Sequence, residues 1–312
     1  MTDSVEARFR EAMALLPDER ATRLGVAVSG GPDSMALLAL AARCYPGRVA
    51  AATVDHGLRA EAADEAAMVA QWCAAHGVPH ATLRPSAPVK GNVQAWARTV
   101  RYALLEGWRA EHGIAYILTA HHADDQLETM IMRLNRGSGI AGLAGVRRRS
   151  GPVFRPLLGM RKAQLLAYAK DAGLPHVDDP SNADLRFDRA ALRARLAAAD
   201  WLDPQAASRS ACALAEAEEA LIWMVRTVAE RHVTQQGSAV RLDRTDFPRE
   251  ILRRLLIMMI GIADPLAPPP RGDALDRLVA CAMAGGKASI GNHLIIGGEH
   301  WTLVPAPPRT TS

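Results

Sequence analysis

The stretch Ser29-Gly-Gly-Pro-Asp-Ser34 places two glycines, two hydroxyls and a carboxylate within six residues. The glycines allow a sharp turn and a close backbone approach that side chains would block. Where a helix follows such a turn, its first N–H groups have no partner within the helix and can bind an anion. This pattern favours a cradle for pyrophosphate or a nucleotide phosphate. The predicted phosphate-binding residues are Ser29, Gly30, Gly31, Pro32, Asp33 and Ser34.

Two elements must position this cradle. Residues 24–28 carry no charge, which is typical of a strand buried on both faces of a parallel sheet. A helix is expected over residues 35–43, with Asp33 and Ser34 capping its first turn. No lysine lies nearby, which excludes a Walker A loop. The alternative is an ordinary glycine turn that joins a strand to a helix.

A second polar group follows the strand expected at residues 115–120. His121, Asp125 and Glu128 are spaced i, i+4 and i+7, so a helix starting here would place them on one stripe. Carboxylates there can hold the Mg²⁺ that accompanies ATP or receive an ammonium group. The imidazole could take a proton from an attacking amine. The alternative is that the positive end of a helix dipole favours acidic residues in the first turn.

Polar residues also follow the strand expected at residues 49–55. Asp55 and His56 lie where parallel sheets bind ligands, so they are candidates to contact adenosine or a second phosphate. A strand-end turn capped by the aspartate is the alternative. Arg98 and Arg101 are three residues apart, so one face of a helix would present both guanidinium groups to phosphates or simply to solvent.

Strands and helices alternate through the first two thirds of the chain. This order predicts an α/β fold with a doubly wound, parallel, five-stranded sheet. The expected strands are residues 24–28, 49–55, 80–83, 115–120 and 152–158.

The composition changes after Asp203-Pro204, where alanine-rich helical segments begin. Within residues 285–304, glycine turns alternate with short apolar runs, which predicts a small β-hairpin. We therefore expect two domains, residues 1–203 and 204–312, of which the second is smaller and mostly helical.

The composition limits which partners, metal sites and cellular compartment this chain is expected to have. The chain has 312 residues, a net charge of +4 and a pI near 9.1, and only four of its 37 basic residues are lysine. Arginine contacts phosphates in a planar, bidentate way, although base composition of the genome is an equal explanation. The four cysteines form no C-x-x-C pair, which disfavours a zinc site, a cluster or a disulfide scaffold. An acidic N-terminus and the lack of a long apolar run favour a cytoplasmic protein.

The first motif resembles the PP-loop of the N-type ATP pyrophosphatases, which cleave ATP between the α and β phosphates. From about residue 20 to 200, the chain further resembles the tRNA(Ile)-lysidine synthases. One departure is Arg189-Ala190, where that family usually has Arg-Asn. The motifs that carry the resemblance are Asp55-His-Gly-Leu-Arg59, Arg98-x-x-Arg101-Tyr102, Ala120-His-His-x-Asp-Asp-Gln-x-Glu-Thr129, Arg136-Gly-Ser-Gly139, Arg155-Pro-Leu-Leu158 and Asp179-Pro-Ser-Asn182.

The resemblance implies a ligase that uses ATP to join L-lysine to C2 of the first anticodon cytidine of a CAU-anticodon isoleucine tRNA. The products are lysidine, AMP and pyrophosphate, and codon reading changes from AUG to AUA. The expected partners are therefore tRNA, lysine and ATP, with Mg²⁺ as a further cofactor and no membrane. The second domain is expected to bind tRNA, and the chain is expected to be a monomer or a homodimer.

The resemblance also implies roles for individual residues. Asp33 and Asp125 are candidate Mg²⁺ ligands, and Arg101 would offset negative charge on the leaving pyrophosphate. Asp125 and Glu128 would position the lysine amine, although which carboxylate binds the metal is left open. His121 or a carboxylate would accept the proton of the amine. Arg193 would contact the nucleotide or an extruded cytosine.

Three other functions are compatible with parts of the sequence. A PP-loop tRNA thiolase would activate the same carbonyl, but such enzymes generally need paired cysteines. A nucleotide sensor or RNA-binding module without catalysis would have no use for the acidic stripe. A glutamine-dependent amidotransferase would need a glutaminase cysteine near the N-terminus, where this chain has none.

Overall fold

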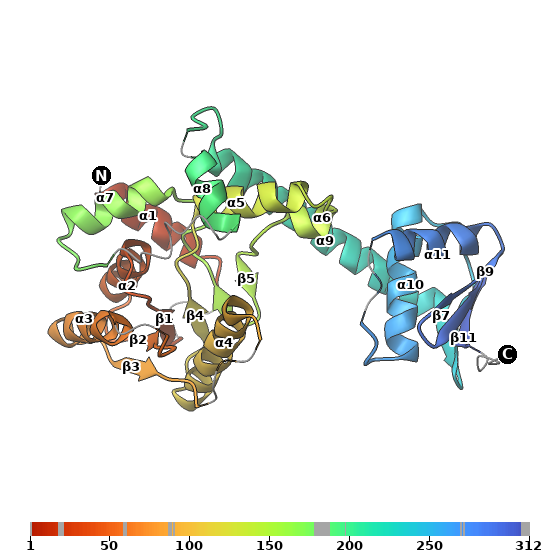
Figure 1. Cartoon of the computed structure of the whole chain (residues 1–312), viewed down its shortest axis with the longest axis horizontal. Coiled ribbons are helices and arrows are strands. Elements are labelled where there is room, and N and C mark those ends of the chain that lie inside the picture. The colour runs from red at the N-terminus through yellow and green to blue at the C-terminus, as the bar shows by residue number, and fades with distance from the viewer. Residues whose placement is uncertain are drawn as a thin grey trace. The chain divides into compact units, whose positions relative to one another are not determined.

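The computed structural model describes residues 2–17, 22–58, 61–86, 89, 91–177, 188–196, 198–268, 270 and 272–306. These residues form two compact units, Met1–Ala215 and Glu216–Ser312, and helix α9 (Pro204–His232) runs from one into the other (Figure 1). Asp203, the end of the expected first domain, immediately precedes α9. The Asp179-Pro-Ser-Asn182 loop, Arg59 and the side chain of Arg189 lie outside the described residues.

The first unit is built on a six-stranded sheet of order β3-β2-β1-β4-β6-β5. Every neighbouring pair is parallel except β5 with β6, so the prediction of a parallel α/β sheet is confirmed and an antiparallel edge strand is added. The strand expected over residues 152–158 shrinks to two residues, because the chain turns at Pro156, which has no N–H to donate. The strands are β1 (Leu24–Ala27), β2 (Val49–Val54), β3 (His80–Leu83), β4 (Tyr116–Leu118), β5 (Arg149–Ser150) and β6 (Val153–Phe154).

Helices cover both faces of this sheet. On one face, Leu24 and Val26 of β1 are fully buried in a core shared with apolar side chains of α1, α2, α3 and α7. On the other face, α4 lies so close that a Cβ on Gly25 would come 2.7 Å from the Trp108 ring, so the strand needs glycine there. The helices are α1 (Thr2–Met13), α2 (Pro32–Cys44), α3 (Glu61–Ala75), α4 (Val93–Glu111), α5 (Ala123–Leu134), α6 (Ile140–Leu143), α7 (Lys162–Asp171) and α8 (Asp188–Leu196).

The order of the strands reverses at β1, and we call the space beyond the carboxyl ends of β1 and β4 the crevice. From β1 the chain moves to β2 and β3 on one side, then returns to β4 on the other side of β1. Ligands of such sheets bind beyond the carboxyl ends of the strands where this reversal occurs. The loop after β1 and the start of α5 after β4 both lie at that point.

The second unit combines helices with a five-stranded antiparallel sheet of order β7-β8-β11-β10-β9. The predicted hairpin is present as β9 and β10, but β7 and β8 were not predicted. The strand β7 is hard to recognise in the sequence because three of its four residues are exposed and polar. The elements are β7 (Val233–Gln236), β8 (Ala239–Leu242), β9 (Lys287–Ile290), β10 (His293–Ile296), β11 (Trp301–Pro305), α10 (Arg249–Ala263) and α11 (Asp273–Met283).

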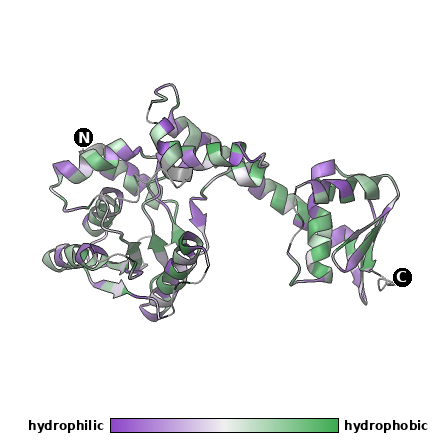
Figure 2. Ribbon diagram, viewed as in Figure 1, coloured by the Kyte–Doolittle hydropathy of each residue, from purple (hydrophilic) through white to green (hydrophobic). Residues whose placement is uncertain are grey.

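The apolar core of the second unit lies between its sheet and α10 and α11. Trp301, Leu303 and Ile295 of the sheet are fully buried against Leu255 and Met259 of α10. Figure 2 shows the centre of the first sheet and much of α10 in the hydrophobic colour, whereas the edge strand β5 is hydrophilic. None of the described helices is both long and apolar enough to span a membrane.

Candidate active site

The predicted phosphate loop joins β1 to α2, but the helix begins earlier than expected. α2 starts at Pro32, and Gly31 is its N-cap residue without a side-chain capping bond. The prediction that Asp33 and Ser34 cap a helix from residue 35 is therefore wrong. Proline favours this earlier start because its fixed φ suits the first helical position. Asp33 and Ser34 lie within the first turn, whose N–H groups have no acceptor inside the helix.

The loop is braced by its own hydroxyls. Ser34 Oγ accepts from the Ser29 N–H at 3.1 Å and donates to the Gly31 carbonyl at 2.9 Å. Gly30 has a φ of +83°, which favours glycine, and its carbonyl accepts from the Val177 N–H at 3.0 Å. These bonds fix the conformation of the loop, and the N–H groups of the first turn of α2 remain available to bind an anion.

Helix α5 begins with a reciprocal cap. His122 Nδ1 accepts from the Asp125 N–H at 3.3 Å, and Asp125 Oδ2 accepts from the His122 N–H at 3.1 Å. His121 therefore precedes the helix, and the expected single stripe of His121, Asp125 and Glu128 is wrong for the histidine. The His121 Nδ1 lies 3.0 Å from the Thr119 hydroxyl instead.

Asp125 and Glu128 share a face of α5, as predicted, and both bind Arg193 of α8. Arg193 Nε donates to Glu128 Oε1 at 2.6 Å, and its Nη2 donates to Asp125 Oδ1 at 3.1 Å. Burial would lower the pKa of Arg193, but hydrogen bonding and the charge of Glu128, with those of Asp125, raise it. The structure thus brings three predicted site residues into one ion-paired group.

His122 was not predicted as a site residue. Its buried ring lies between the phosphate loop and α5, with Nε2 3.5 Å from Asp33 Oδ2 and 3.6 Å from Asp125 Oδ2. Burial would lower the pKa of His122, but the contact with Asp33 and the charges of Asp125 and Asp124 raise it overall. The signal in the sequence was the capping-box spacing from His122 to Asp125, three residues later.

Asp55 and His56 lie at the end of β2 and differ in their partners. Asp55 Oδ1 accepts from the Gly57 N–H at 2.9 Å and Oδ2 from Arg84 Nε at 3.0 Å, so the strand-end turn is present. Both ring nitrogens of His56 are buried without a hydrogen-bond partner among the described residues. The pKa of His56 is lowered by burial and then by the charge of Arg101, an exposed residue of α4.

His56 also lies beside an aromatic side chain of α4. Its ring centroid is 5.8 Å from that of Trp96. One turn further along the helix, the Arg98 guanidinium covers the Tyr102 ring at 5.2 Å. A neutral imidazole with two unused ring nitrogens can donate one hydrogen bond and accept another, which suits a nucleobase.

Asp33 provides an oxygen suitable for Mg²⁺. Its Oδ1 is buried and has no hydrogen-bond partner within the described part of the chain. Mg²⁺ commonly takes one or two protein carboxylates together with substrate phosphates and water. Both oxygens of Asp125, the other predicted ligand, already accept hydrogen bonds, and no group of three metal-ligating side chains occurs among the described residues. Asp33 therefore fits a Mg²⁺ carried in with a nucleotide.

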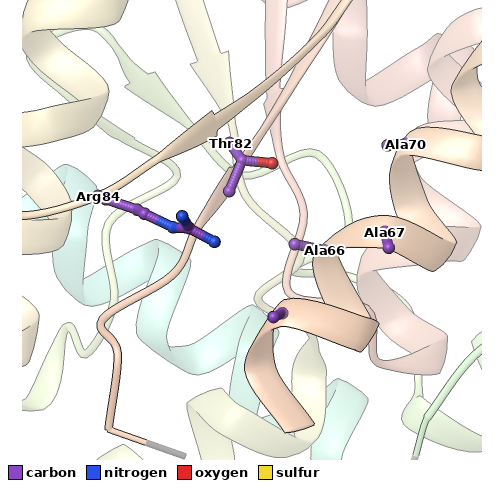
Figure 3. A pocket seen from close by; sticks show the side chains of 6 residues that line it. Ala66, Ala67, Ala70, Thr82 and Arg84 are labelled. Atoms are coloured by element: carbon purple, nitrogen blue, oxygen red, sulfur yellow. The ribbon is translucent and has the colours of Figure 1, made fainter. Parts of the chain in front are cut away.

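A cavity of about 290 Å³ lies between α3 and β3, next to the end of β2 where Arg84 binds Asp55. Figure 3 shows Thr82 and Arg84 extending into the space that faces the helix. Four alanines at positions 63, 66, 67 and 70 form its other wall, so Arg84, which binds Asp55, supplies its one charge. The cavity was not predicted, although alanines at helical spacing indicate such a small-residue face.

Comparisons with known proteins agree with this geometry. Residues 1–199 match the PP-loop domain family. The tRNA(Ile)-lysidine synthase of Zymomonas mobilis is 41% identical, with 96% of this chain and 94% of that protein covered. That of Novosphingobium aromaticivorans is 43% identical, with 91% and 88% covered. The structure of a U34-tRNA thiolase from Methanococcus maripaludis has a TM-score of 0.56 over 68% of this chain and 78% of that chain, at 16% identity, which shows a shared fold.

Proposed function

The chain belongs to the tRNA(Ile)-lysidine synthase family, and from that premise we propose that it joins the ε-amine of lysine to C2 of a cytidine in tRNA(Ile). The family resemblance inferred from the motifs is confirmed, the chain is a ligase, and ATP is its substrate. We further propose that the modified cytidine is the first anticodon nucleotide of the CAU-anticodon tRNA.

One observation carries the assignment of this chemistry to the crevice. A continuous path of side chains runs from Asp33 in the phosphate loop through His122 to Asp125, with gaps of 3.5 and 3.6 Å. This path supports our proposal that ATP phosphates and the lysine ammonium bind side by side. A reaction that first adenylylates a carbonyl oxygen and then admits an amine needs both sites close together.

The first step activates the cytosine. Its O2 attacks the α-phosphorus of ATP, the bond to the oxygen that bridges to the β-phosphate breaks, and pyrophosphate leaves. The N–H groups of the phosphate loop bind the phosphates. The hydroxyls of Ser29 and Ser34 join them by exchanging their hydrogen bonds within the loop for bonds to phosphate oxygens. Asp33 would hold Mg²⁺, which neutralises phosphate charge when bound, and Arg101 would offset the charge that builds on pyrophosphate.

The second step transfers lysine. The ε-amine attacks C2, and the bond from C2 to the adenylylated oxygen breaks, which releases AMP. The amine must first lose a proton, because its ordinary pKa is near 10.4. Asp125 and Glu128 receive the lysine ammonium in place of Arg193, and one of these carboxylates or His121 takes the proton. Arg193, once displaced, is free to contact the nucleotide or the cytosine.

We propose tRNA binding for the second domain, residues 204–312. Within the second unit, α9 exposes Ile222, Trp223 and Met224, with Arg226 on the same exposed stretch. An exposed aromatic ring beside an arginine suits base stacking and phosphate contact. The double variant Trp223→Ala, Arg226→Gln is expected to weaken tRNA binding about tenfold in filter-binding assays, since one stacked base contributes roughly 1–3 kcal/mol. Unchanged affinity would place the tRNA contact elsewhere.

The decisive experiment measures AMP release from ATP by the purified protein with CAU-anticodon tRNA(Ile), with and without lysine. The mass of the anticodon nucleoside is determined in the same samples. Lysine-dependent AMP release and a gain in mass equal to lysine minus water are expected. AMP release without lysine incorporation would overturn the choice of nucleophile, and sulfide or ammonia would be tried next.

A further inference from the structure

We propose that His122 is a positioning residue that holds Asp33 and Asp125 together across the crevice through the Nε2–H of one buried imidazole. The inference rests on the proposed function, which gives those two carboxylates their roles at the ATP and lysine sites. It adds a residue that belongs to neither the predicted phosphate loop nor the predicted acidic stripe.

The first observation concerns Nδ1, which determines the orientation of the ring. Nδ1 lies 3.3 Å from the Asp125 backbone nitrogen and accepts its proton, while the Asp125 carboxylate accepts from the His122 N–H in return. An Nδ1 that accepts a hydrogen bond leaves the proton of a neutral imidazole on Nε2. The α5 cap therefore sets both the direction of the ring and its tautomer.

The second observation concerns what Nε2 faces. Asp33 Oδ2 lies at 3.5 Å and Asp125 Oδ2 at 3.6 Å, so Nε2 faces carboxylates from both α2 and α5 at ion-pair distance. The His122 residue is only 4% exposed, so water competes little for these contacts. Two carboxylates this close to one donor repel each other, and an N–H that faces both in a poorly solvated site offsets part of that repulsion.

A mechanical consequence follows from the topology. Asp33 follows β1 and Asp125 follows β4, and these strands are direct neighbours in the sheet. The strands determine the approximate separation of the two helix starts, and His122 determines the final approach of their side chains. Loss of the bridge should let the carboxylates move apart, and a misplacement of about 1 Å can cost roughly 100-fold in rate.

The test separates the two nitrogens of the ring. His122→Asn keeps an N-cap oxygen for the Asp125 N–H but is too short to reach Asp33. His122→Gln is longer and can present an amide N–H toward the carboxylates. For His122→Asn we expect a melting temperature near that of the wild type and lysidine formation slowed at least tenfold, with kcat affected more than KM. His122→Gln should recover part of the lost rate of lysidine formation. The control is His112→Asn at an exposed histidine that follows α4, and it should change neither the melting temperature nor the rate.

A second readout does not depend on activity. In ¹⁵N-histidine-labelled protein, the resonance lost in His122→Asn identifies the ring, which should carry its proton on Nε2. Asp33→Asn should shift that Nε2–H signal, whereas the exposed Asp64→Asn should not.

The outcomes distinguish the two proposals. A wild type that forms no lysidine overturns the proposed function, and the NMR measurement still tests the bridge. An active wild type whose His122→Asn variant keeps full activity overturns the bridge alone. If His122→Asn fails to fold, the resonance lost in His122→Gln identifies the ring, and an Nε2–H signal that Asp33→Asn does not shift overturns the bridge as well.

Discussion

The two units of this protein bury different kinds of side chains. Among the described residues, the first unit buries Ser34, Asp55, His122, Glu128 and several other polar groups, many near the carboxyl ends of β1, β2 and β4. The second unit buries one charged residue, Glu218, whose carboxylate is bound by both terminal nitrogens of Arg254 at 2.9 and 2.7 Å. The rest of its described core is apolar.

The difference indicates that the first unit sacrifices some folding stability by burying polar groups that can take part in a reaction. Burying polar groups is costly unless each finds a partner, and clustered titratable groups at strand ends are typical of active sites. In the first unit the buried titratable groups contact one another although they come from helices that are far apart in sequence. In the second unit the single pair joins α9 to α10 and serves packing. Four predictions test this contrast, starting with the largest expected effect.

Asp33→Asn tests the catalytic side of the contrast. The variant keeps the shape of the side chain but loses the charge that fits Mg²⁺ and faces His122. Lysidine formation is expected to fall at least 100-fold, with little change in melting temperature, as for other groups that stabilise charge in a transition state. Asp64→Asn, in the exposed first turn of α3, is the control. A loss of stability with activity retained would make Asp33 a structural residue.

Arg193→Gln tests whether the acidic pair is a ligand site rather than a structural one. Removal of the guanidinium leaves Asp125 and Glu128 open to another cation, so lysine should bind about tenfold more tightly without nucleotide, or roughly 1.4 kcal/mol. Equilibrium dialysis with labelled lysine measures this affinity, and the rate of lysidine formation should fall at the same time. Arg195→Gln, exposed on the same helix, is the control. Weaker lysine binding in Arg193→Gln would show that the arginine supports the site.

Glu218→Ala tests the structural side. It leaves the half-buried Arg254 without its bidentate partner but still paired with Glu250, so we expect a loss of about 2 kcal/mol in free energy of unfolding. Urea denaturation measures that loss, and the activity of the folded fraction should stay near that of the wild type. Glu219→Ala, exposed one residue later, should fall within about 0.5 kcal/mol of the wild type.

The smallest expected effect is a pH dependence within the first unit. Burial lowers the pKa of His80 below its ordinary value of 6.5, and its Nε2 lies 2.9 Å from the Thr53 hydroxyl. The unfolded chain therefore binds a proton more readily, so His80 contributes stability above pH 6.5 that is lost as the pH falls below that value. His80→Gln should lose less stability than the wild type between pH 7.5 and 5.5 in urea denaturation. An equal loss in both proteins would show that His80 does not contribute.

Local spacing predicted the elements around the candidate site. The glycine loop, the strand ends and the shared face of Asp125 and Glu128 depend on local pattern, and in the structure His122 lies within 3.5 Å of Asp33 and 3.6 Å of Asp125. The start of α2 was missed because proline at the first helical position outweighs the capping tendency of Asp33 and Ser34. His122 was missed because two adjacent histidines look equivalent in sequence, and only the helix start decides which one turns inward.

The second unit was harder to predict for a different reason. β7 and β8 are four residues each, and β7 shows three exposed residues in a row, so neither the length nor the pattern indicates a strand. β8 pairs on one side with β11, which lies some sixty residues later in the chain, and on the other side with β7. The distant pairing of β8 leaves no local signal, and the polar, exposed residues of β7 hide the hairpin that these two short strands form.

The guanidinium of Arg193 has a consequence for how the lysine site responds to salt. Because Asp125 and Glu128 already hold a cation, binding of a lysine ammonium there exchanges one positive charge for another and leaves the net charge of the pocket unchanged. A cation binds an unoccupied acidic pocket more weakly as dissolved salt screens the attraction. When one cation replaces another, salt screens both to a similar extent, so the affinity changes little. Under the proposed assignment, lysine affinity should therefore be nearly insensitive to ionic strength, and the protein itself supplies the counterion that its substrate replaces.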